Sequence, residues 1–285
     1  LALIESGAAE AFDLKPHQLA LAMASHSGEP RHTEGVMSWL EALGLEEAAL
    51  HCGQHAPMWA KATADLYREG QEPSPRHNNC SGKHTGMLTM MQHLGGEQAI
   101  GANYEDYDHP VQAHIRHVAN QFVDADLTQA DWARDGCAVP NYAMPLKDLA
   151  LSFARLLTPP EGFEQACHSL LSAWGDRPDL VAGSERFDTA VMLATDSAVL
   201  SKGGAEGVQA ALIPSKGIGL AVKALDGAQR AAEQAMASLL VAQGALDLAD
   251  EPLRKHWSAA DRTVRNVRGD RIGEIIVLGQ DLETA

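Results

Sequence analysis

The chain has 285 residues, of which 45% are hydrophobic and 21% are charged, so it is long enough for one large domain or two lobes around a proper core. Its 38 acidic and 22 basic residues give a net charge of −16, which disfavours nonspecific binding to nucleic acid or to an anionic membrane. No apolar run approaches the roughly 18 residues needed to span a bilayer, and the first residues do not resemble a signal peptide.

Apolar side chains recur at helical spacing in the first two thirds of the chain, which predicts helices over residues 29–44, 109–122, 145–157 and 163–174. In the first of these, Pro30 suits the first turn and Gly44 suits the end. This part of the chain is therefore predicted to be mostly helical.

After residue 195 the pattern changes to short apolar runs separated by glycine, which predicts antiparallel strands over residues 198–204, 207–213 and 217–225. An alanine-rich helix is predicted over residues 227–244, and a closing strand over residues 271–279. Strands and helices segregated in this way indicate an α+β fold rather than a βαβ array. We expect a single domain over 1–285, with a mostly helical part over about 1–195 and an antiparallel sheet with a long helix over about 196–285.

Four cysteines, at positions 52, 80, 137 and 167, are too few and too scattered for a disulfide framework in a chain of this length. We therefore expect reduced thiols and a cytoplasmic protein. Cys52 lies in HCGQH between two histidines, yet the string matches no standard zinc spacing. A buried packing residue is the plainer interpretation of this cysteine.

Residues 78–84, NNCSGKH, place several reactive side chains at a predicted helix start. Cys80, Lys83 and His84 stand at positions i, i+3 and i+4, so a helix would bring them to one face. A nearby lysine and a helix N-terminus both favour the thiolate, which a nucleophile or a soft metal ligand must be. The spacing of a phosphate-binding loop is absent. A cysteine nucleophile, a metal site and a capped helix with a buried cysteine remain as alternatives.

The string DGCAVP, residues 135–140, offers Asp135 and Cys137 in a predicted turn ahead of a proline. A cysteine after a glycine is usually a packing residue. Paired in space with Cys80, however, Cys137 would complete a thiolate metal site.

Serines and lysines offer a second kind of chemistry. Ser25 and Ser27 lie in ASHSGEPRH, at a junction between helices where a serine also serves as a cap. Lys202 and Lys216 each stand beside glycines at a strand end. A lysine in a dry pocket can lose its proton and activate a serine, whereas a lysine in a turn is usually a surface residue.

Taken in order, these segments are similar to the L-asparaginase II family of the rhizobial type. The matching strings are ASHSGEPRH, HCGQH, NNCSGKHTGM, DHPVQ, DGCAVPNYAMPL, LVAGSERFDT, AVLSKGGAEG and GIGLAVKALDG. They run from residue 24 to about residue 227, with weaker similarity in VRNVRGDRIGEI near the end. CSGKH followed by a distant DGC is a specific combination.

The resemblance implies a fold like those of serine β-lactamases and glutaminases, in which an antiparallel sheet is flanked by helices beside a helical lobe. It also implies a zinc ion held by Cys80, Lys83 and Cys137, with His84 and Asp135 in the same pocket to bind substrate. Lys83 must be neutral to donate its lone pair, which a nearby dication favours. Whether the zinc is catalytic or structural is left open.

The resemblance further implies an enzyme that hydrolyses the side-chain amide of L-asparagine to L-aspartate and ammonia. Ser25 and Lys202 match one serine–lysine pair of the family, in which the serine attacks the amide carbon and forms an acyl-enzyme. The alternatives are a non-catalytic metal-binding or amino-acid-binding relative, and a related serine–lysine hydrolase such as a glutaminase or a β-lactam hydrolase. The oligomeric state is left open, a homodimer included.

One part of the family pattern has no counterpart here. The family carries an S-x-x-K motif on the helix that leads into LALIE, and no serine of this chain has a lysine three positions later. The sequence begins at Leu1, just after the place of that motif. We therefore expect that an N-terminal segment is missing, and with it this second serine–lysine pair, a candidate nucleophile and the first strands. The chain as given is expected to turn over asparagine poorly.

Overall fold

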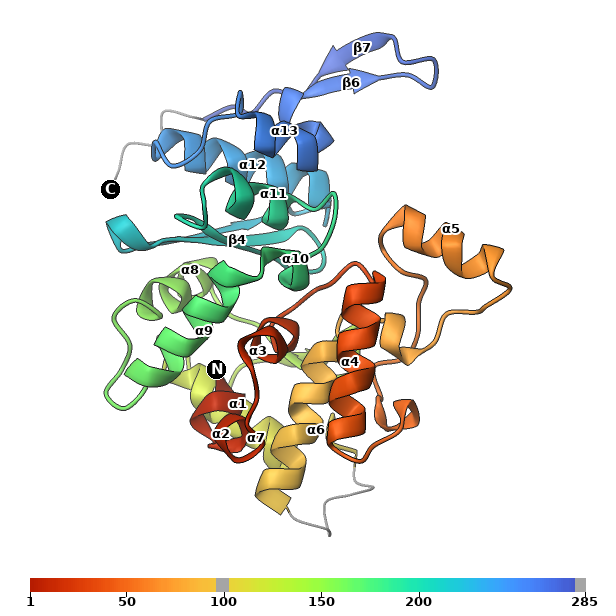
Figure 1. The fold of residues 1–285 in the computed structure, drawn as a ribbon. Coiled ribbons are helices and arrows are strands. Elements are labelled where there is room, and N and C mark those ends of the chain that lie inside the picture. Colours follow the sequence, from red (N-terminus) through yellow and green to blue (C-terminus); the bar gives the residue numbers. More distant parts are fainter. Residues whose placement is uncertain (96–102, 280–285) are drawn as a thin grey trace.

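The structure is a computed structural model that describes residues 1–95 and 103–279, and its elements form a helical half and a half built on a small sheet (Figure 1). The helices are α1 Ala2–Glu5, α2 Ala8–Ala11, α3 Pro16–Ala22, α4 Pro30–Ala42, α5 Ala60–Arg68, α6 Ser81–Gly95, α7 Pro110–Asn120, α8 Leu146–Arg155, α9 Glu164–Asp176, α10 Pro178–Val181, α11 Phe187–Ala194, α12 Gln229–Ala242 and α13 Glu251–His256. The strands are β1 Trp132–Arg134, β2 Pro140–Tyr142, β3 Leu200–Gly203, β4 Val208–Ile213, β5 Ile218–Lys223, β6 Thr263–Arg265 and β7 Arg271–Glu274.

The helical half is organised around α6, which contacts α1, α2, α3, α4 and α7. Its side chains Met87, Leu88 and Met90 are buried in the largest apolar cluster of the molecule. Helix α3 approaches α6 very closely at Gly82, where an added Cβ atom would lie 2.4 Å from the carbonyl oxygen of Leu21. Only glycine fits this contact, because any other residue would push the two helices apart.

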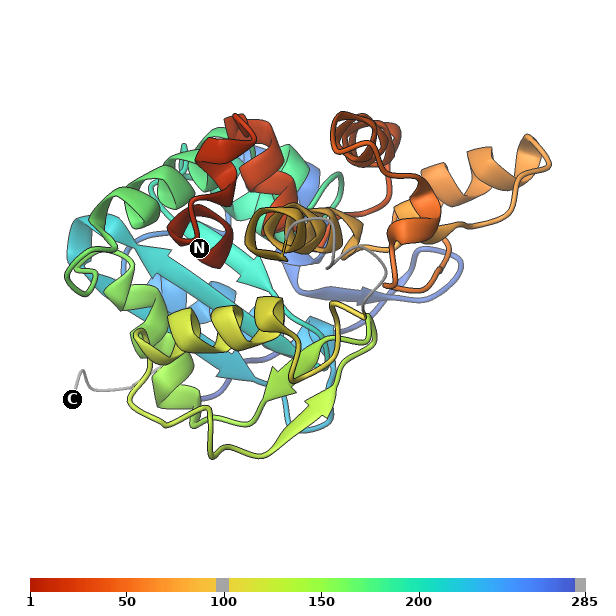
Figure 2. The ribbon, with the colours of Figure 1, turned by 90° about the horizontal axis from the view of Figure 1, so that it is seen from below.

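The second half is built on the antiparallel sheet β3–β4–β5. Side chains of β4 alternate between the two faces of the sheet, as a strand requires. Ala211 and Ile213 pack with Met236 and Leu240 of α12, while Leu212 belongs to the cluster of the helical half. The sheet therefore lies between α11 and α12 on one side and α8 on the other (Figures 1 and 2).

The α+β class predicted from the sequence is confirmed. The four helices predicted in the first two thirds correspond to α4, α7, α8 and α9. The three antiparallel strands and the alanine-rich helix correspond to β3, β4, β5 and α12. The helices α1, α2, α5, α10, α11 and α13, the hairpin β1–β2 and the strand β6 were not predicted. Among the described residues, no helix is both long and apolar enough to cross a membrane.

The closing strand predicted over residues 271–279 is wrong in its length and in its partner. Strand β7 ends at Glu274 and pairs with β6 in a separate two-stranded sheet that projects from the molecule (Figure 1). All four residues of β7 are exposed. The apolar residues that suggested a longer strand, among them Leu278, follow the strand and remain outside the core.

Candidate functional site

Ser25 and Lys202 meet although 177 residues separate them in the sequence. Ser25 lies in the loop between α3 and α4, where its backbone amide donates a hydrogen bond to the carbonyl oxygen of Val181 at 3.0 Å. Lys202 projects from β3, and its Nζ donates to Ser25 Oγ at 2.7 Å and to the carbonyl oxygen of Gly203 at 2.7 Å. Lys216, the other candidate lysine, is exposed in the 3₁₀ turn η4 (Pro214–Lys216). Its Nζ donates a hydrogen bond to the carbonyl oxygen of Gln243 and not to a serine hydroxyl.

Burial lowers the pKa of Lys202 to about 8. The negative charge of Asp188 opposes this shift, whereas the positive charge of Arg186 adds to it. A substantial fraction of Lys202 is therefore neutral near pH 8 and has a lone pair available for a proton. This geometry and charge state are those of a base that activates a serine hydroxyl.

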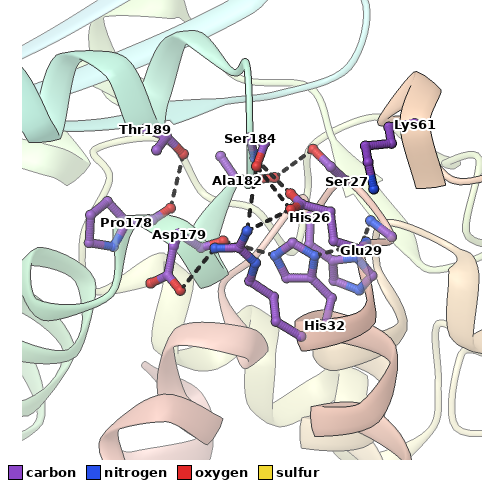
Figure 3. Close-up of polar contacts among 12 residues, drawn as sticks. His26, Ser27, Glu29, His32, Lys61, Pro178, Asp179, Ala182, Ser184 and Thr189 are labelled. Carbon is purple, nitrogen blue, oxygen red and sulfur yellow. Dashed lines mark hydrogen bonds and ion pairs between the residues drawn. The ribbon is translucent and has the colours of Figure 1, made fainter. Parts of the chain in front are cut away.

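The loop that carries Ser25 is held by buried and partly buried hydrogen bonds of the residues that follow it (Figure 3). Ser27 Oγ donates to the carbonyl oxygen of Ala182 at 2.8 Å. The Glu29 carboxylate accepts from the backbone amide of Ser184 at 2.7 Å and from its hydroxyl at 2.9 Å, and pairs with Arg31 at 2.8 Å. Because these bonds tie residues 27–31 to the chain between α10 and α11, the backbone at Ser25 is fixed relative to the second half.

Two buried histidines add to this support (Figure 3). The rings of His26 and His32 stack with centroids 4.8 Å apart. His26 Nε2 lies 2.9 Å from Ser81 Oγ at the start of α6, and His32 Nε2 lies 2.9 Å from the carbonyl oxygen of Asp179. Burial lowers the pKa of both histidines, so both rings are neutral around pH 7.

A second group of reactive side chains gathers where α6 begins. The hairpin turn between β1 and β2 brings Cys137 and Asp135 to this point, and Lys83 Nζ lies 3.0 Å from Cys137 Sγ and 3.7 Å from Asp135 Oδ2. The backbone amide of Cys137 donates to Asp135 Oδ1 at 2.8 Å, and that of Cys80 donates to Asn78 Oδ1 at 2.8 Å. Cys80, Lys83 and His84 thus all lie beside Cys137 at the helix start, as their spacing predicted.

The charges in this group stabilise one another. A hydrogen bond with Cys137 lowers the pKa of Cys80 to about 6 and raises that of Cys137, so the two thiols hold one thiolate at neutral pH. Burial lowers the pKa of Lys83, but the charges of Cys80, Cys137 and Asp135 outweigh it and leave the pKa above its usual value. Burial raises the pKa of Asp135, and the charge of Lys83 brings it below its usual value.

His84 lies on the buried side of this group. Its Nδ1 is 2.7 Å from the hydroxyl of Tyr104, which also accepts a hydrogen bond from the backbone amide of His51 at 2.8 Å. Among the described residues, the buried His84 Nε2 makes no hydrogen bond of ordinary geometry, although Cys137 lies close enough to raise the pKa of the ring. A buried polar atom without a partner is uncommon in a native protein and is available to a ligand.

The donor chemistry of this group fits a soft divalent cation. Cys80 supplies a thiolate near neutral pH, and thiolates are preferred ligands of zinc. In the described parts of the chain, no three histidine, cysteine or acidic side chains are arranged to hold a metal ion. A zinc site with Cys80 and Cys137 therefore depends on Lys83 as its third donor, and this lysine would have to lose its proton.

The charges of Cys80 and Lys83 both act on the pKa of Lys202. The serine–lysine pair therefore lies close to the side chains gathered at the start of α6. The site residues singled out in the sequence are thus found in two neighbouring groups. Their chemical roles stay predictions. Cys52, by contrast, is buried, and burial raises the pKa of its thiol to about 12, which makes it inert.

Sequence reasoning missed three residues that contact or support these groups: Tyr104, Arg186 and Asp188. The last two lie in GSERFDT, where a charged residue stands among residues that begin an apolar helix. Asp188 is buried between Phe187 and Ala190, and a buried carboxylate in such a segment is the signal that could have marked it.

A cavity of about 400 Å³ lies on the other side of Lys83, between α1, α6, α7 and α8. Apart from Lys83 and Ser152, its lining consists of apolar residues. It offers no set of polar groups for the charged ends of an amino acid, so we assign it no part in substrate binding.

A family model described as L-asparaginase II matches residues 1–277 of the chain. No curated protein matches the chain.

Proposed function

This chain belongs to the L-asparaginase II family, and from that membership we propose that it hydrolyses the side-chain amide of L-asparagine to L-aspartate and ammonia, with Ser25 as nucleophile and Lys202 as its base. The observation that carries the assignment of these two residues is the 2.7 Å hydrogen bond between Lys202 Nζ and Ser25 Oγ. The lowered pKa of Lys202 supports the same roles, because only a neutral lysine can take the proton of the hydroxyl.

In the first half of the reaction, Ser25 Oγ attacks the amide carbon while its proton moves to Lys202 Nζ. The resulting tetrahedral intermediate collapses when Lys202 returns this proton to the amide nitrogen and ammonia leaves. A β-aspartyl group is then bound to Ser25 Oγ as an ester. General acid–base catalysis of this kind contributes about 10²–10⁴-fold to a rate.

In the second half, water replaces ammonia. Lys202 takes a proton from the water as the oxygen attacks the ester carbon, and then returns it to Ser25 Oγ as aspartate leaves. Because Lys202 also bonds to the carbonyl oxygen of Gly203, its Nζ stays close to Ser25 Oγ through both halves. The hydrogen bonds around Glu29 hold the serine in place in the same way.

We propose that the side chains gathered at the start of α6 hold zinc, with Cys80, Lys83 and Cys137 as ligands. When bound, zinc would supply a positive charge that orients negatively charged substrate groups and favours neutral Lys83. Asp135 carries a negative charge beside these ligands and suits the α-ammonium group of an amino acid. His84 Nε2 is buried beside Cys137 without a hydrogen bond of ordinary geometry among the described residues, and suits a polar substrate atom.

The decisive test is ammonia release from L-asparagine by the full-length protein and by its Ser25→Ala variant. We expect the variant to lose activity by about 10⁴-fold or more, since it has no nucleophile. Ser172→Ala is the matched control, because Ser172 lies on α9 and its hydroxyl bonds to Asp176 on the same helix. Full activity in Ser25→Ala would sink the assignment.

A substrate panel separates this proposal from its rivals. Asparagine, glutamine and a β-lactam are compared at equal concentration. A pocket discriminates one methylene by only about 10–200-fold, so weak glutamine turnover is compatible with an asparaginase. Binding of asparagine without turnover of any substrate would favour a non-catalytic relative.

A further inference from the structure

The segment that begins α11 contacts both sides of the serine–lysine pair. Arg186 and Asp188 are two residues apart, and neither bonds directly to Ser25 Oγ or Lys202 Nζ. One reaches the backbone of the loop that carries Ser25, and the other reaches the strand that carries Lys202. No other short segment described above touches the backbone of both.

The Asp188 carboxylate is hydrogen-bonded to the residues of β3 on both sides of Lys202. Its Oδ1 accepts a hydrogen bond from the hydroxyl of Ser201 at 2.7 Å, and its Oδ2 accepts one from the backbone amide of Gly203 at 2.8 Å. Gln209 on the neighbouring strand donates to the same carboxylate at 2.5 Å and to Ser201 Oγ at 2.9 Å. Every one of these partners is buried or half-buried, so the carboxylate fixes the backbone from which Lys202 projects.

The contact also explains a glycine next to the lysine. A Cβ atom at Gly203 would lie 3.2 Å from Asp188 Oδ2 and 3.2 Å from Gln209 Oε1. Such contacts are tighter than ordinary packing, so a side chain here would displace the carboxylate. Glycine at position 203 is therefore needed to leave room for the Asp188 carboxylate, in addition to marking the end of the strand.

Arg186 holds the other partner. Its Nη1 donates to the carbonyl oxygen of Ser25 at 3.1 Å and makes a weak contact with Met58 Sδ at 3.7 Å. The backbone amide of Ser25 donates to the carbonyl oxygen of Val181, so Ser25 is anchored at both its N–H and its C=O.

We propose that Arg186 and Asp188 are positioning residues for the serine–lysine pair, with Arg186 fixing the backbone of Ser25 and Asp188 fixing the strand and the charge environment of Lys202. This inference rests on the proposed function for its catalytic meaning. Neither residue needs to touch the substrate in order to act.

The charges of the two residues oppose each other at Lys202. Burial is the main cause of the lowered pKa of this lysine, Asp188 raises the pKa, and Arg186 lowers it. The other charged groups that act on Lys202 come from the start of α6, where Cys80 raises its pKa and Lys83 lowers it. Changes at positions 186 and 188 are therefore expected to move the protonation midpoint of Lys202 in opposite directions.

The test measures this midpoint without relying on turnover. The full chain is labelled with a trace of acetic anhydride between pH 6 and pH 11, and acetylation of Lys202 is quantified by mass spectrometry. The variants are Asp188→Asn and Arg186→Gln, which remove one charge each with little change of size. Thermal unfolding confirms that each variant is folded.

We expect Asp188→Asn to shift the labelling midpoint of Lys202 downward by about one pH unit, and Arg186→Gln to shift it upward. Glu10→Gln is the matched control, because Glu10 is exposed on α2 in the helical half and is not among the groups that act on the pKa of Lys202, so its neutralisation is expected to leave the midpoint unchanged. A residue with a merely structural role would not produce shifts of opposite sign.

Unchanged midpoints in both folded variants overturn the inference. If Asp188→Asn does not fold, Arg186→Gln decides, and absence of its upward shift overturns the inference equally. The pH profile of ammonia release is recorded in parallel and is expected to move with the labelling midpoint. If the unmodified protein releases no ammonia while the midpoints shift as expected, the proposed function fails and the positioning of Lys202 by this segment stands.

Discussion

Lys83 and Lys202 are both half-buried lysines in neighbouring parts of the site, yet their charges differ. Burial alone lowers the pKa of each. Around Lys83, two thiols and Asp135 reverse the effect and keep the ammonium charged. Around Lys202, Asp188 is offset by Arg186, and the effect of burial prevails.

The comparison teaches that the neighbours of a buried lysine decide which chemistry it can perform. A lysine surrounded by anions keeps its proton until a divalent metal ion displaces it. Such a lysine is suited to a metal site. A lysine with a balanced set of charges loses its proton near pH 8, which suits a base. The two lysines are thus suited to different tasks.

Lys202→Arg is the change most able to break this comparison. Arginine keeps the positive charge and cannot lose it, so it can hold Ser25 Oγ and cannot accept its proton. We expect ammonia release to fall by about 10³-fold. Activity within tenfold of the unmodified protein would mean that the charge of residue 202 matters and its basicity does not.

Removal of a thiol tests the other lysine. We expect Cys137→Ser to weaken zinc binding by more than about 100-fold, because serine is a poor ligand and Lys83 loses its contact to the sulfur. Zinc per chain is measured by native mass spectrometry after exchange into zinc-buffered solution. Cys167→Ser is the control, because Cys167 is buried among apolar residues in a separate cluster. Equal zinc content in both variants would contradict the site.

The pH profile sharpens the contrast. Because Lys202 has a pKa of about 8 and acts in its neutral form, kcat/KM is expected to rise with pH and to level off above this value. Below it, we expect a loss of about tenfold per pH unit. Steady-state ammonia release from pH 6 to pH 10 measures the curve. A profile that falls with rising pH across this range would show that Lys202 works as an acid.

The smallest expected effect is on stability and concerns the buried histidines, in which burial is again the main cause of the pKa shift. The pKa of His26 is lowered in the folded protein, so the unfolded chain binds more protons below its ordinary value of about 6.5. Stability is therefore complete above that value and falls as pH decreases, by up to about 1.4 kcal/mol per pH unit for this histidine.

Urea unfolding at pH 7, 6 and 5 measures this slope. We expect His26→Gln to show a shallower decrease in the free energy of unfolding than the unmodified protein. His117→Gln, a change at an exposed histidine, is the control. Identical slopes in the unmodified protein and His26→Gln would show that the stacked pair does not sense pH.

Local patterns in the sequence predicted the parts of the fold that depend on local spacing. The apolar stripe of residues 109–122 became α7, and the glycine-separated runs after residue 195 became the antiparallel sheet. The interval between Cys80 and Lys83 predicted their common face, because three residues make almost one helical turn. The strand at 271–279 failed because an apolar run does not specify which strand it pairs with.

Contacts between distant segments could not be derived in this way. The hydrogen bond between Ser25 and Lys202 joins residues from opposite halves, and only the family resemblance suggested it before the structure. Asp188 looked like an ordinary polar residue at a helix start. Its importance depends on the strand packed beside it, which no spacing within GSERFDT reveals.

The close contact at Gly82 has a practical consequence for anyone who wishes to evolve this protein toward other amides. Helix α3 ends three residues before Ser25, and α6 begins beside Cys80, so a side chain at position 82 would force both ends of the pocket to move at once. A saturation library at this codon is expected to yield almost only glycine among functional clones. Diversity is better spent on Asp135 and Met58, whose side chains can change without separating α3 from α6.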